Sequence, residues 1–140
     1  MAKYAPPGTG AGNGAILAHT LGVLAKDIYI VHGYTDLRYG PNGLNGELEE
    51  RGCEQEDECL YLFCGRRADR IKLLYRSNGC SACFHLRQDP VQNPGQDLEQ
   101  LLFRYYWPRQ GKDVEKIDFQ TFLKVLKGEK DAFPLPRADS

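Results

Sequence analysis

One hairpin signal near the middle of the chain constrains its fold more than any other feature. Asn78-Gly79 separates two runs that are rich in aromatic and β-favouring residues. Asn-Gly is the strongest short hairpin signal because both central residues of a type I′ turn need a positive φ. A third run of the same kind, residues 60–64, is followed by a second turn signal at residues 65–69. Residues 60–87 therefore predict a three-stranded antiparallel meander.

The Asn-Gly turn also predicts how the last two strands pair. With Asn78 and Gly79 as the loop residues, one side of the hairpin is apolar and the other is mostly polar and basic, and a slip of one residue would mix the two sides. We expect Tyr61 and Phe63 of the first strand on the apolar side, under a helix. The other side would take Leu60, Leu62 and Cys64. The predicted pairs are Ser77–Cys80, Tyr75–Ala82, Leu73–Phe84, Ile71–Leu86, Arg76–Ser81, Leu74–Cys83, Lys72–His85 and Arg70–Arg87.

The remaining patterns predict an α+β fold in a single domain. The meander and an N-terminal strand at residues 28–32 would form an antiparallel sheet, packed with two to four helices. The helices are predicted at residues 15–26, 42–51, 98–106 and 112–128, with Asp118 as a candidate cap for the last. The inward residues would be Ile16, Leu17, Leu21 and Leu24 in the first helix and Leu44 and Leu48 in the second. Residues 1–27 are expected to be a flexible extension, 28–128 the domain and 129–140 a flexible tail.

Charge and cysteine content limit the function only loosely. The net charge of −1 over 140 residues gives no overall attraction to nucleic acid. Residues 45–58 nevertheless hold seven acidic residues and one basic residue, and residues 60–112 hold nine basic and four acidic. Two such zones can bind nucleic acid locally or pair with each other. Five cysteines, an odd number, and the lack of a secretory signal predict the reducing cytoplasm. The apolar stretch at residues 15–25 is too short to span a membrane.

The basic residues beside the hairpin allow two interpretations. Arg66 and Arg67 lie in the turn before the second strand of the meander, and Arg70 faces Arg87 across the hairpin. A like-charge pair on neighbouring strands is unfavourable unless an anion or an acid lies between them. One interpretation is therefore a phosphate-binding surface that also includes Lys72. The other is a solvated sheet face, or a face that the acidic second helix covers and neutralises.

Three motifs, taken together, resemble a known family. They are Tyr34-Thr-Asp-Leu-Arg-Tyr-Gly40, the run from Leu60 to Lys72 with Arg66-Arg67-Ala68-Asp69, and Tyr105-Tyr-Trp-Pro108. Their order and spacing resemble the small TnpB accessory protein that is encoded beside the transposase in insertion sequences of the IS66 group. That family is distinct from the RNA-guided nuclease of the same name. The resemblance covers residues 28–126 and implies a role in transposition, with the transposase of the same element as a partner.

Two functions of different class follow. The first is a non-catalytic accessory protein of transposition that binds nucleic-acid backbone, with DNA as the expected partner. Its candidate contacts are Arg38, Arg66, Arg67, Arg70, Lys72 and Arg87. The second is a protein-interaction adaptor that docks on the transposase without binding nucleic acid. Its candidate contacts are Tyr105, Tyr106 and Trp107, together with the acidic helix predicted at residues 42–51. The salt dependence of DNA binding separates the two.

A metal site is not expected, although Cys80 and Cys83 have the spacing of zinc ligands. Residues three apart on a flat strand point to opposite faces, and the chain has no second Cys-x-x-Cys. The cysteines are therefore predicted to be reduced, metal-free and mostly small buried apolar side chains.

An enzymatic function is not expected either, and no cofactor is predicted. A nuclease or transposase site needs clustered carboxylates, and the only acids inside the family motifs are Asp36 and Asp69. We expect Asp36 to cap a turn or to pair with Arg38, and Asp69 to orient Arg66 or Arg67.

Overall fold

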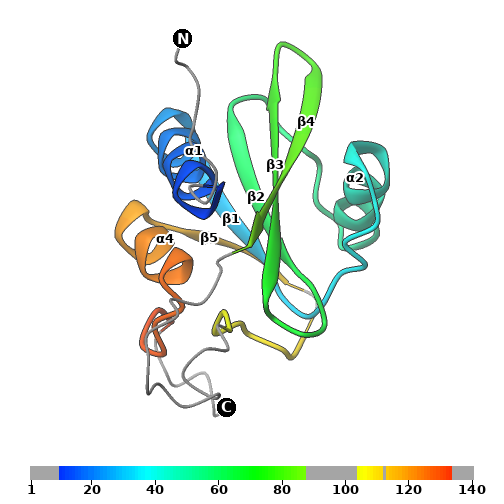
Figure 1. The fold of residues 1–140 in the computed structure, drawn as a ribbon. Coiled ribbons are helices and arrows are strands. Elements are labelled where there is room, and N and C mark those ends of the chain that lie inside the picture. Colours follow the sequence, from blue (N-terminus) through cyan, green and yellow to red (C-terminus); the bar gives the residue numbers. More distant parts are fainter. Residues whose placement is uncertain (1–9, 88–103, 112, 134–140) are drawn as a thin grey trace, which may run out of the picture.

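The hairpin predicted from Asn78-Gly79 lies at one edge of a five-stranded sheet. The computed structural model describes residues 10–87, 104–111 and 113–133. The strand order is β4-β3-β2-β1-β5; β1 and β2 are parallel, and the other neighbouring strands are antiparallel. This sheet and the helices around it form a single α+β domain, as predicted (Figure 1). The elements are α1 (Gly10–Leu24), β1 (Asp27–Val31), α2 (Pro41–Glu50), β2 (Cys59–Cys64), β3 (Arg70–Ser77), β4 (Cys80–Arg87), β5 (Val114–Ile117) and α4 (Phe119–Leu126).

The pairing of β3 with β4 confirms the predicted register. Asn78 and Gly79 have φ values of 53° and 78°, as a type I′ turn requires. Every predicted pair is present, from the turn to the Arg70–Arg87 pair at the far end. Leu73 is buried, and Phe84 packs against the same core.

The predicted faces of β2 are wrong. Leu62 pairs with Leu73 and Tyr61 pairs with Leu74, so Tyr61 and Phe63 lie on the face opposite to Leu73. Every residue of β2 is buried, because helices cover both sides of the sheet. A strand that is apolar on both faces shows no alternation, and alternation is what sets a register in sequence-based reasoning.

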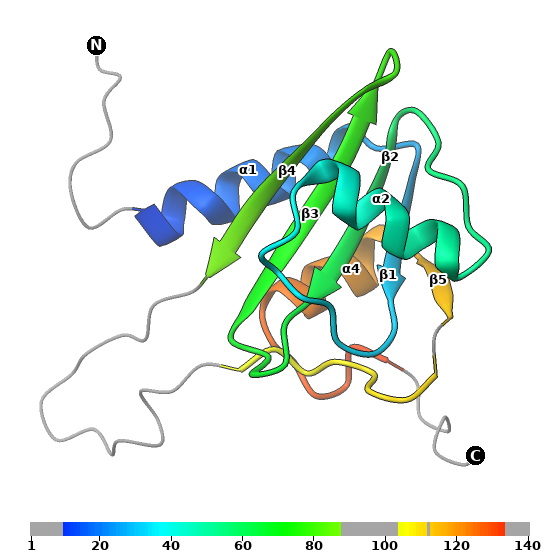
Figure 2. The ribbon, with the colours of Figure 1, turned by 90° about the vertical axis from the view of Figure 1, so that its right-hand side faces the viewer.

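Two hydrophobic cores lie on the two faces of the sheet. Helices α1 and α4 pack on one face and α2 packs on the other (Figure 1 and Figure 2). Leu44 and Leu48 of α2 are buried, which confirms the inward side of that helix. The helix ends before Gly52, which has a φ of 76°. The N–H groups of Gly52 and Cys53 donate to the carbonyl oxygens of Glu49 and Leu48, at 3.0 and 2.9 Å, and so satisfy the end of the helix.

The inward side of α1 matches the predicted one only at Leu21. Ala18 and Leu21 are buried, and Gly22 lies so close to α4 that a Cβ atom there would overlap the ring of Phe122. The exposed residues of the predicted inward side are Ile16, Leu17 and Leu24. The two helices approach each other so closely that only small residues fit between them. The helix therefore turns Ala18 and Gly22 inward and leaves larger apolar side chains exposed.

The helix predicted at residues 112–128 is divided into a strand and a shorter helix. Val114 and Ile117, which are β-branched, belong to β5, and β5 pairs with the outer edge of β1. Helix α4 begins at Phe119. Asp118 caps it, because its side chain accepts a hydrogen bond of 2.8 Å from the N–H of Thr121. Asp118 is therefore a cap, as predicted, but the helix that it caps begins at Phe119 and not at residue 112.

Some predictions fall on residues outside the described ones. The predicted helix at residues 98–106 is described only for its last three residues, which are not helical. The limits of the domain at residues 28 and 128 stay predictions. Before residue 28, α1 supplies buried residues to the core, and after residue 128, Ala132 and Phe133 are buried in the same core.

Candidate functional site

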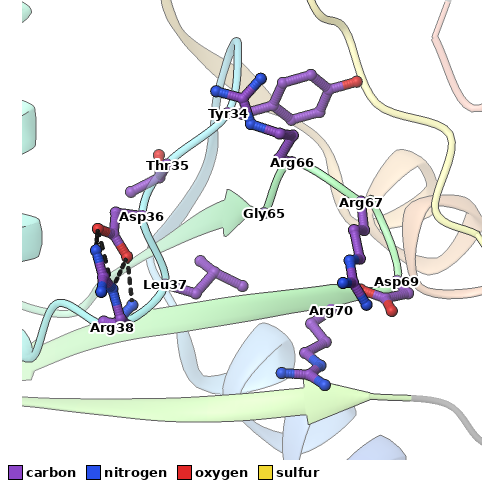
Figure 3. Close-up of a pocket in the computed structure, with 10 residues that line it drawn as sticks. All are labelled: Tyr34, Thr35, Asp36, Leu37, Arg38, Gly65, Arg66, Arg67, Asp69 and Arg70. Carbon is purple, nitrogen blue, oxygen red and sulfur yellow. Dashed lines mark hydrogen bonds and ion pairs between the residues drawn. The ribbon is translucent and has the colours of Figure 1, made fainter.

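Two segments meet at the edge of the sheet where β1 and β2 end. Because these strands are parallel, the chain after Val31 and the chain after Cys64 leave the sheet on the same side. The N–H of Thr35 donates a hydrogen bond to the carbonyl oxygen of Cys64 at 2.8 Å and joins the two segments. A pocket of about 610 Å³ lies between them (Figure 3). Its lining residues are Tyr34, Thr35, Asp36, Leu37, Arg38, Gly65, Arg66, Arg67, Asp69 and Arg70.

Backbone hydrogen bonds hold the β2–β3 turn, residues 65–69, on one side of this pocket. Ala68 is buried, has a φ of 60° and donates its N–H to the carbonyl oxygen of Gly65 at 3.0 Å. The N–H of Tyr105 in turn donates to the carbonyl oxygen of Ala68 at 2.5 Å. With its buried residue fixed in this way, the turn presents Arg66 and Arg67 at the surface.

The segment at residues 104–108 also holds the other side of the pocket. The indole N–H of Trp107 donates to the carbonyl oxygen of Val31 at 2.9 Å, at the end of β1. The N–H of Gly33 donates to the carbonyl oxygen of Pro108, also at 2.9 Å. Both segments that form the pocket are therefore attached to one stretch of chain that is distant from them in sequence.

Asp36 and Arg38 form an ion pair at the rim of the pocket. The guanidinium of Arg38 donates to both carboxylate oxygens of Asp36, at 2.8 to 3.3 Å, and the backbone N–H of Arg38 donates to Oδ1 at 3.0 Å. The side-chain hydrogen bonds first, and then the backbone one, lower the pKa of Asp36 to about 2. Both expected roles of Asp36, capping a turn and pairing with Arg38, are confirmed.

Three further arginines line the pocket. The side chains of Arg66, Arg67 and Arg70 form no hydrogen bond or ion pair with the part of the chain that the structure describes. Asp69 lies beside Arg67 in Figure 3, but no interaction joins them, so the expected orienting role of Asp69 is wrong. Both side chains sit on a surface turn, where water screens an ion pair and little is gained by closing it.

The basic surface continues from the pocket onto β3 and β4. Lys72 Nζ donates to the carbonyl oxygen of Tyr39 at 2.6 Å, and Arg70 faces Arg87. Partial desolvation, followed by the charges of Lys72 and Arg70, lowers the pKa of His85, although the side chain is exposed. The structure thus brings four predicted contacts, Arg38 included, to the pocket itself. It places Lys72 and Arg87 on the adjoining strands.

The acidic helix does not neutralise this surface in the described structure. α2 covers the sheet face that carries Phe63 and Leu74, as the alternative interpretation requires. Two of its three acids, however, have local partners: Glu47 pairs with Arg51 at 3.2 Å, and Glu49 accepts a hydrogen bond from Asn45 at 3.3 Å.

Three pocket residues, Tyr34, Thr35 and Leu37, were not predicted as site residues. Thr35 is only 5% exposed, and its hydroxyl has no hydrogen-bond partner among the described residues. All three directly follow the first strand of the sheet. The sequence gives the position of that strand but not its parallel pairing with β2, and that pairing is what brings these residues to the arginines.

A family model described as IS66 Orf2 like protein matches residues 26–132. The chain belongs to the IS66 Orf2-like family. This confirms the resemblance seen in the three motifs, and membership indicates an accessory role in insertion-sequence transposition. No curated protein and no solved structure matches the chain.

The aromatic group suggested as a partner-binding surface is mostly internal in this IS66 Orf2-like chain. Tyr105 and Trp107 are 2% and 6% exposed, and they belong to the core between the sheet, α1 and α4. Tyr106 between them is 50% exposed. Tyr105 and Trp107 are thus placed to hold the two sides of the pocket rather than to contact a partner protein. A partner-binding role stays a prediction for Tyr106.

The described residues of the IS66 Orf2-like chain hold no group of three or more His, Cys, Asp or Glu side chains arranged to bind a metal ion. Cys80 and Cys83 pair with Ser77 and Leu74 on opposite faces of the hairpin. Burial, followed by the charge of Asp69, raises the pKa of the Cys64 thiol to about 12, so this thiol is protonated. None of the helices in the described part of the chain has the length and apolar character needed to cross a membrane.

Proposed function

We propose that this IS66 Orf2-like protein is a non-catalytic accessory protein that binds the backbone of DNA. It would do so through the pocket between the chain after β1 and the β2–β3 turn. The observation that supports this most strongly is the convergence of Arg38, Arg66, Arg67 and Arg70 around one cavity. Two of these arginines come from a turn, one from the chain after β1 and one from the start of β3. A solvated sheet face would not require residues from separate segments to meet.

The chemistry of the group suits phosphate oxygens. A guanidinium can grip a phosphate through two parallel hydrogen bonds, and of these four arginines only Arg38 has a carboxylate partner among the described residues. Contacts of this kind position a protein on DNA without reading its sequence. We further propose that the protein acts in the cytoplasm beside the transposase of its element.

Replacing Arg66 and Arg67 together by Ala tests this function. Affinity for DNA should fall by a similar factor across unrelated sequences, and the slope of log affinity against log salt should shrink by roughly one unit per lost contact. The double variant Lys127→Ala with Lys130→Ala removes the same charge from exposed positions at the end of α4, outside the pocket lining, and is the matched control. Equal losses in the two double variants would mean that the pocket has no special part in binding.

A protein adaptor is the second candidate function. The observation that favours it is the set of large apolar side chains that α1 exposes, because an exposed apolar patch marks an interaction surface. These residues are Ile16, Val23 and Leu24, at 66%, 61% and 62% exposure. If the parent protein binds no DNA at low salt but binds its transposase, and Val23→Glu abolishes that binding, the adaptor function replaces the first.

A further inference from the structure

The two edges of the sheet differ in how well they are protected against pairing with another strand. Strand β5 forms one edge and is four residues long, with two charged residues, Glu115 and Lys116, in its middle. Strand β4 forms the other edge and is eight residues long. It contains no Pro, Gly, Asp, Glu or Lys, and it pairs with β3 along its whole length without a bulge. Short strands, charges and bulges keep an edge from pairing, so β5 is protected and β4 is not.

The outer edge of β4 offers backbone hydrogen-bonding groups. Ser77 and Cys80 flank the two-residue turn and face each other, so in a type I′ hairpin they exchange both backbone hydrogen bonds. Every second residue of β4 does the same, which directs the N–H and C=O groups of Ser81, Cys83 and His85 away from β3. No described strand lies on that side of β4 (Figure 2). Each of these three residues thus offers a donor and an acceptor to a further strand.

The charges of β4 favour a second copy of the same strand that runs antiparallel. The basic side chains of β4 lie at its C-terminal end, at His85 and Arg87. A parallel copy in register would place each of them beside its own equivalent, and like charges on neighbouring strands repel each other. An antiparallel copy centred on Cys83 instead pairs Ser81 with His85 and sets no basic residue of β4 opposite another.

The side chains on the other face of β4 fit the same pairing. Ala82 and Phe84 lie on the sheet face that α1 covers, where Ala82 is exposed and Phe84 is only partly buried. With Cys83 at the centre, the large ring of Phe84 lies opposite the small side chain of Ala82 from the other copy. The pairing would therefore remove apolar surface of both side chains from water.

Helix α1 adds apolar surface beside this edge. It packs against β4, and Figure 2 shows its N-terminal end extending past that strand. Because α1 lies on the face of the sheet and not beside its edge, this end would lie over β4 of a second copy. Ile16, in the N-terminal half of α1, is 66% exposed. A second copy would thus cover apolar surface that a single chain leaves in contact with water.

We propose that two copies of this chain pair through their β4 strands, antiparallel and with Cys83 at the two-fold axis, so that their sheets join into one. Backbone hydrogen bonds of Ser81, Cys83 and His85 hold the two strands together, and the same patch serves both copies, as in most homodimers. Residues that pair across two strands share a face, so the basic surfaces of the two copies lie on the same side of the joined sheet. This interface goes beyond the proposed function, and its formation does not require DNA.

Sedimentation equilibrium of the full chain without DNA, from about 1 to 300 µM, tests the dimer. The parent protein should be dimeric at the upper end of this range and dissociate on dilution. Ala82→Lys places a charge at an exposed position in the middle of the interface and should raise the dimer dissociation constant at least roughly tenfold. Gln120→Lys is the matched control, because it adds the same charge at an exposed position of α4. A parent that is monomeric throughout, or equal dissociation constants for Ala82→Lys and Gln120→Lys, would overturn the inference.

Oxidation with diamide tests the position of the two-fold axis. Two residues that exchange hydrogen bonds across antiparallel strands have Cα atoms about 5.5 Å apart, a distance that a disulfide can span. Cys80→Ser removes the exposed cysteine of β4, so diamide should then oxidise the two Cys83 thiols to a disulfide and give a covalent dimer. Adding Cys83→Ser should abolish that product. A non-covalent dimer that gives no Cys83 disulfide would place the interface elsewhere and overturn the inference. None of these outcomes bears on DNA binding, which the arginine variants test separately.

Discussion

Gly22 of α1 lies against the ring of Phe122 in α4, so closely that a Cβ atom at position 22 would overlap that ring. Phe122 is fully buried, and the sheet lies beneath both helices, so the ring has little room to move aside. The distance between the two helices on this face of the sheet is therefore set by a glycine.

Gly22→Ala should destabilise the protein by about 1–3 kcal/mol, the usual cost of overpacking a core. Gly46 is the matched control, because it also lies within a helix but a Cβ atom there would have no neighbour within 4 Å. Gly46→Ala should stabilise the protein by roughly 0.5–1 kcal/mol through its better helix propensity. Urea unfolding of both variants measures these changes, and stabilisation by both would contradict the close packing of α1 on α4.

Leu73→Ala should cost about 2–5 kcal/mol of stability, because Leu73 is almost fully buried and pairs with Leu62 in the middle of the sheet. Leu17→Ala should change stability by less than about 0.5 kcal/mol, since Leu17 is 39% exposed on α1. Urea unfolding again distinguishes the two sites. A loss at Leu17 as large as that at Leu73 would show that α1 packs through a different side.

His85 should make stability depend on pH near neutrality. Partial desolvation and the charges of Lys72 and Arg70 lower its pKa in the folded protein below the ordinary 6.5, so the unfolded chain binds this proton more readily. The His85 contribution is therefore highest above about pH 7 and is lost as the pH falls through 6.5 toward the lowered folded value. Unfolding midpoints at about pH 7.5 and 5.5 should differ less in His85→Gln than in the parent protein. An unchanged difference would assign the pH dependence to other groups.

Asp36 should titrate far below an ordinary aspartate. Its pKa of about 2, against 3.8 for the unperturbed group, follows mainly from the hydrogen bonds of Arg38. Its contribution to stability is present above pH 3.8 and is lost as the pH falls through about 2. Carboxyl carbon-13 NMR should show Arg38→Ala returning the pKa toward 3.8. Lys72→Ala should have a smaller effect, because Lys72 acts only through its charge.

The purified protein should contain no stoichiometric zinc. Cys80 and Cys83 face opposite sides of the hairpin, and the described residues offer no cluster of three ligands. Elemental analysis of protein purified without chelators checks this directly. One zinc ion per chain would contradict the strand geometry around these cysteines.

The sequence was sufficient for features that depend on neighbouring residues. Asn78-Gly79 fixed the register of β3 with β4, and the spacing of Leu44 and Leu48 gave the inward side of α2. Features that depend on distant pairing were missed. Val114–Ile117 is a strand only because the outer edge of β1 is there to receive it, and nothing in four residues signals such a partner.

The candidate site divides in the same way. Arg66, Arg67 and Arg70 could be grouped from the sequence because they are local to one turn and the strand after it. Arg38 was included in the predicted site because it lies in the family motif at residues 34–40. Thr35 could not be identified, because its burial and its unpartnered hydroxyl arise only when β1 lies parallel to β2 and its N–H reaches Cys64.

The hydrogen bonds from Tyr105 and Trp107 to the carbonyl oxygens of Ala68 and Val31 have a consequence for variation within the family. Both acceptors belong to the backbone, so they persist whatever side chains stand at positions 31 and 68. Neither hydrogen bond involves the stretch of sequence between Arg87 and Arg104, so a change in the length of that stretch leaves both contacts available. Relatives with very different lengths at this point should therefore still keep an aromatic pair spaced like Tyr105 and Trp107, and with it the geometry of the two loops.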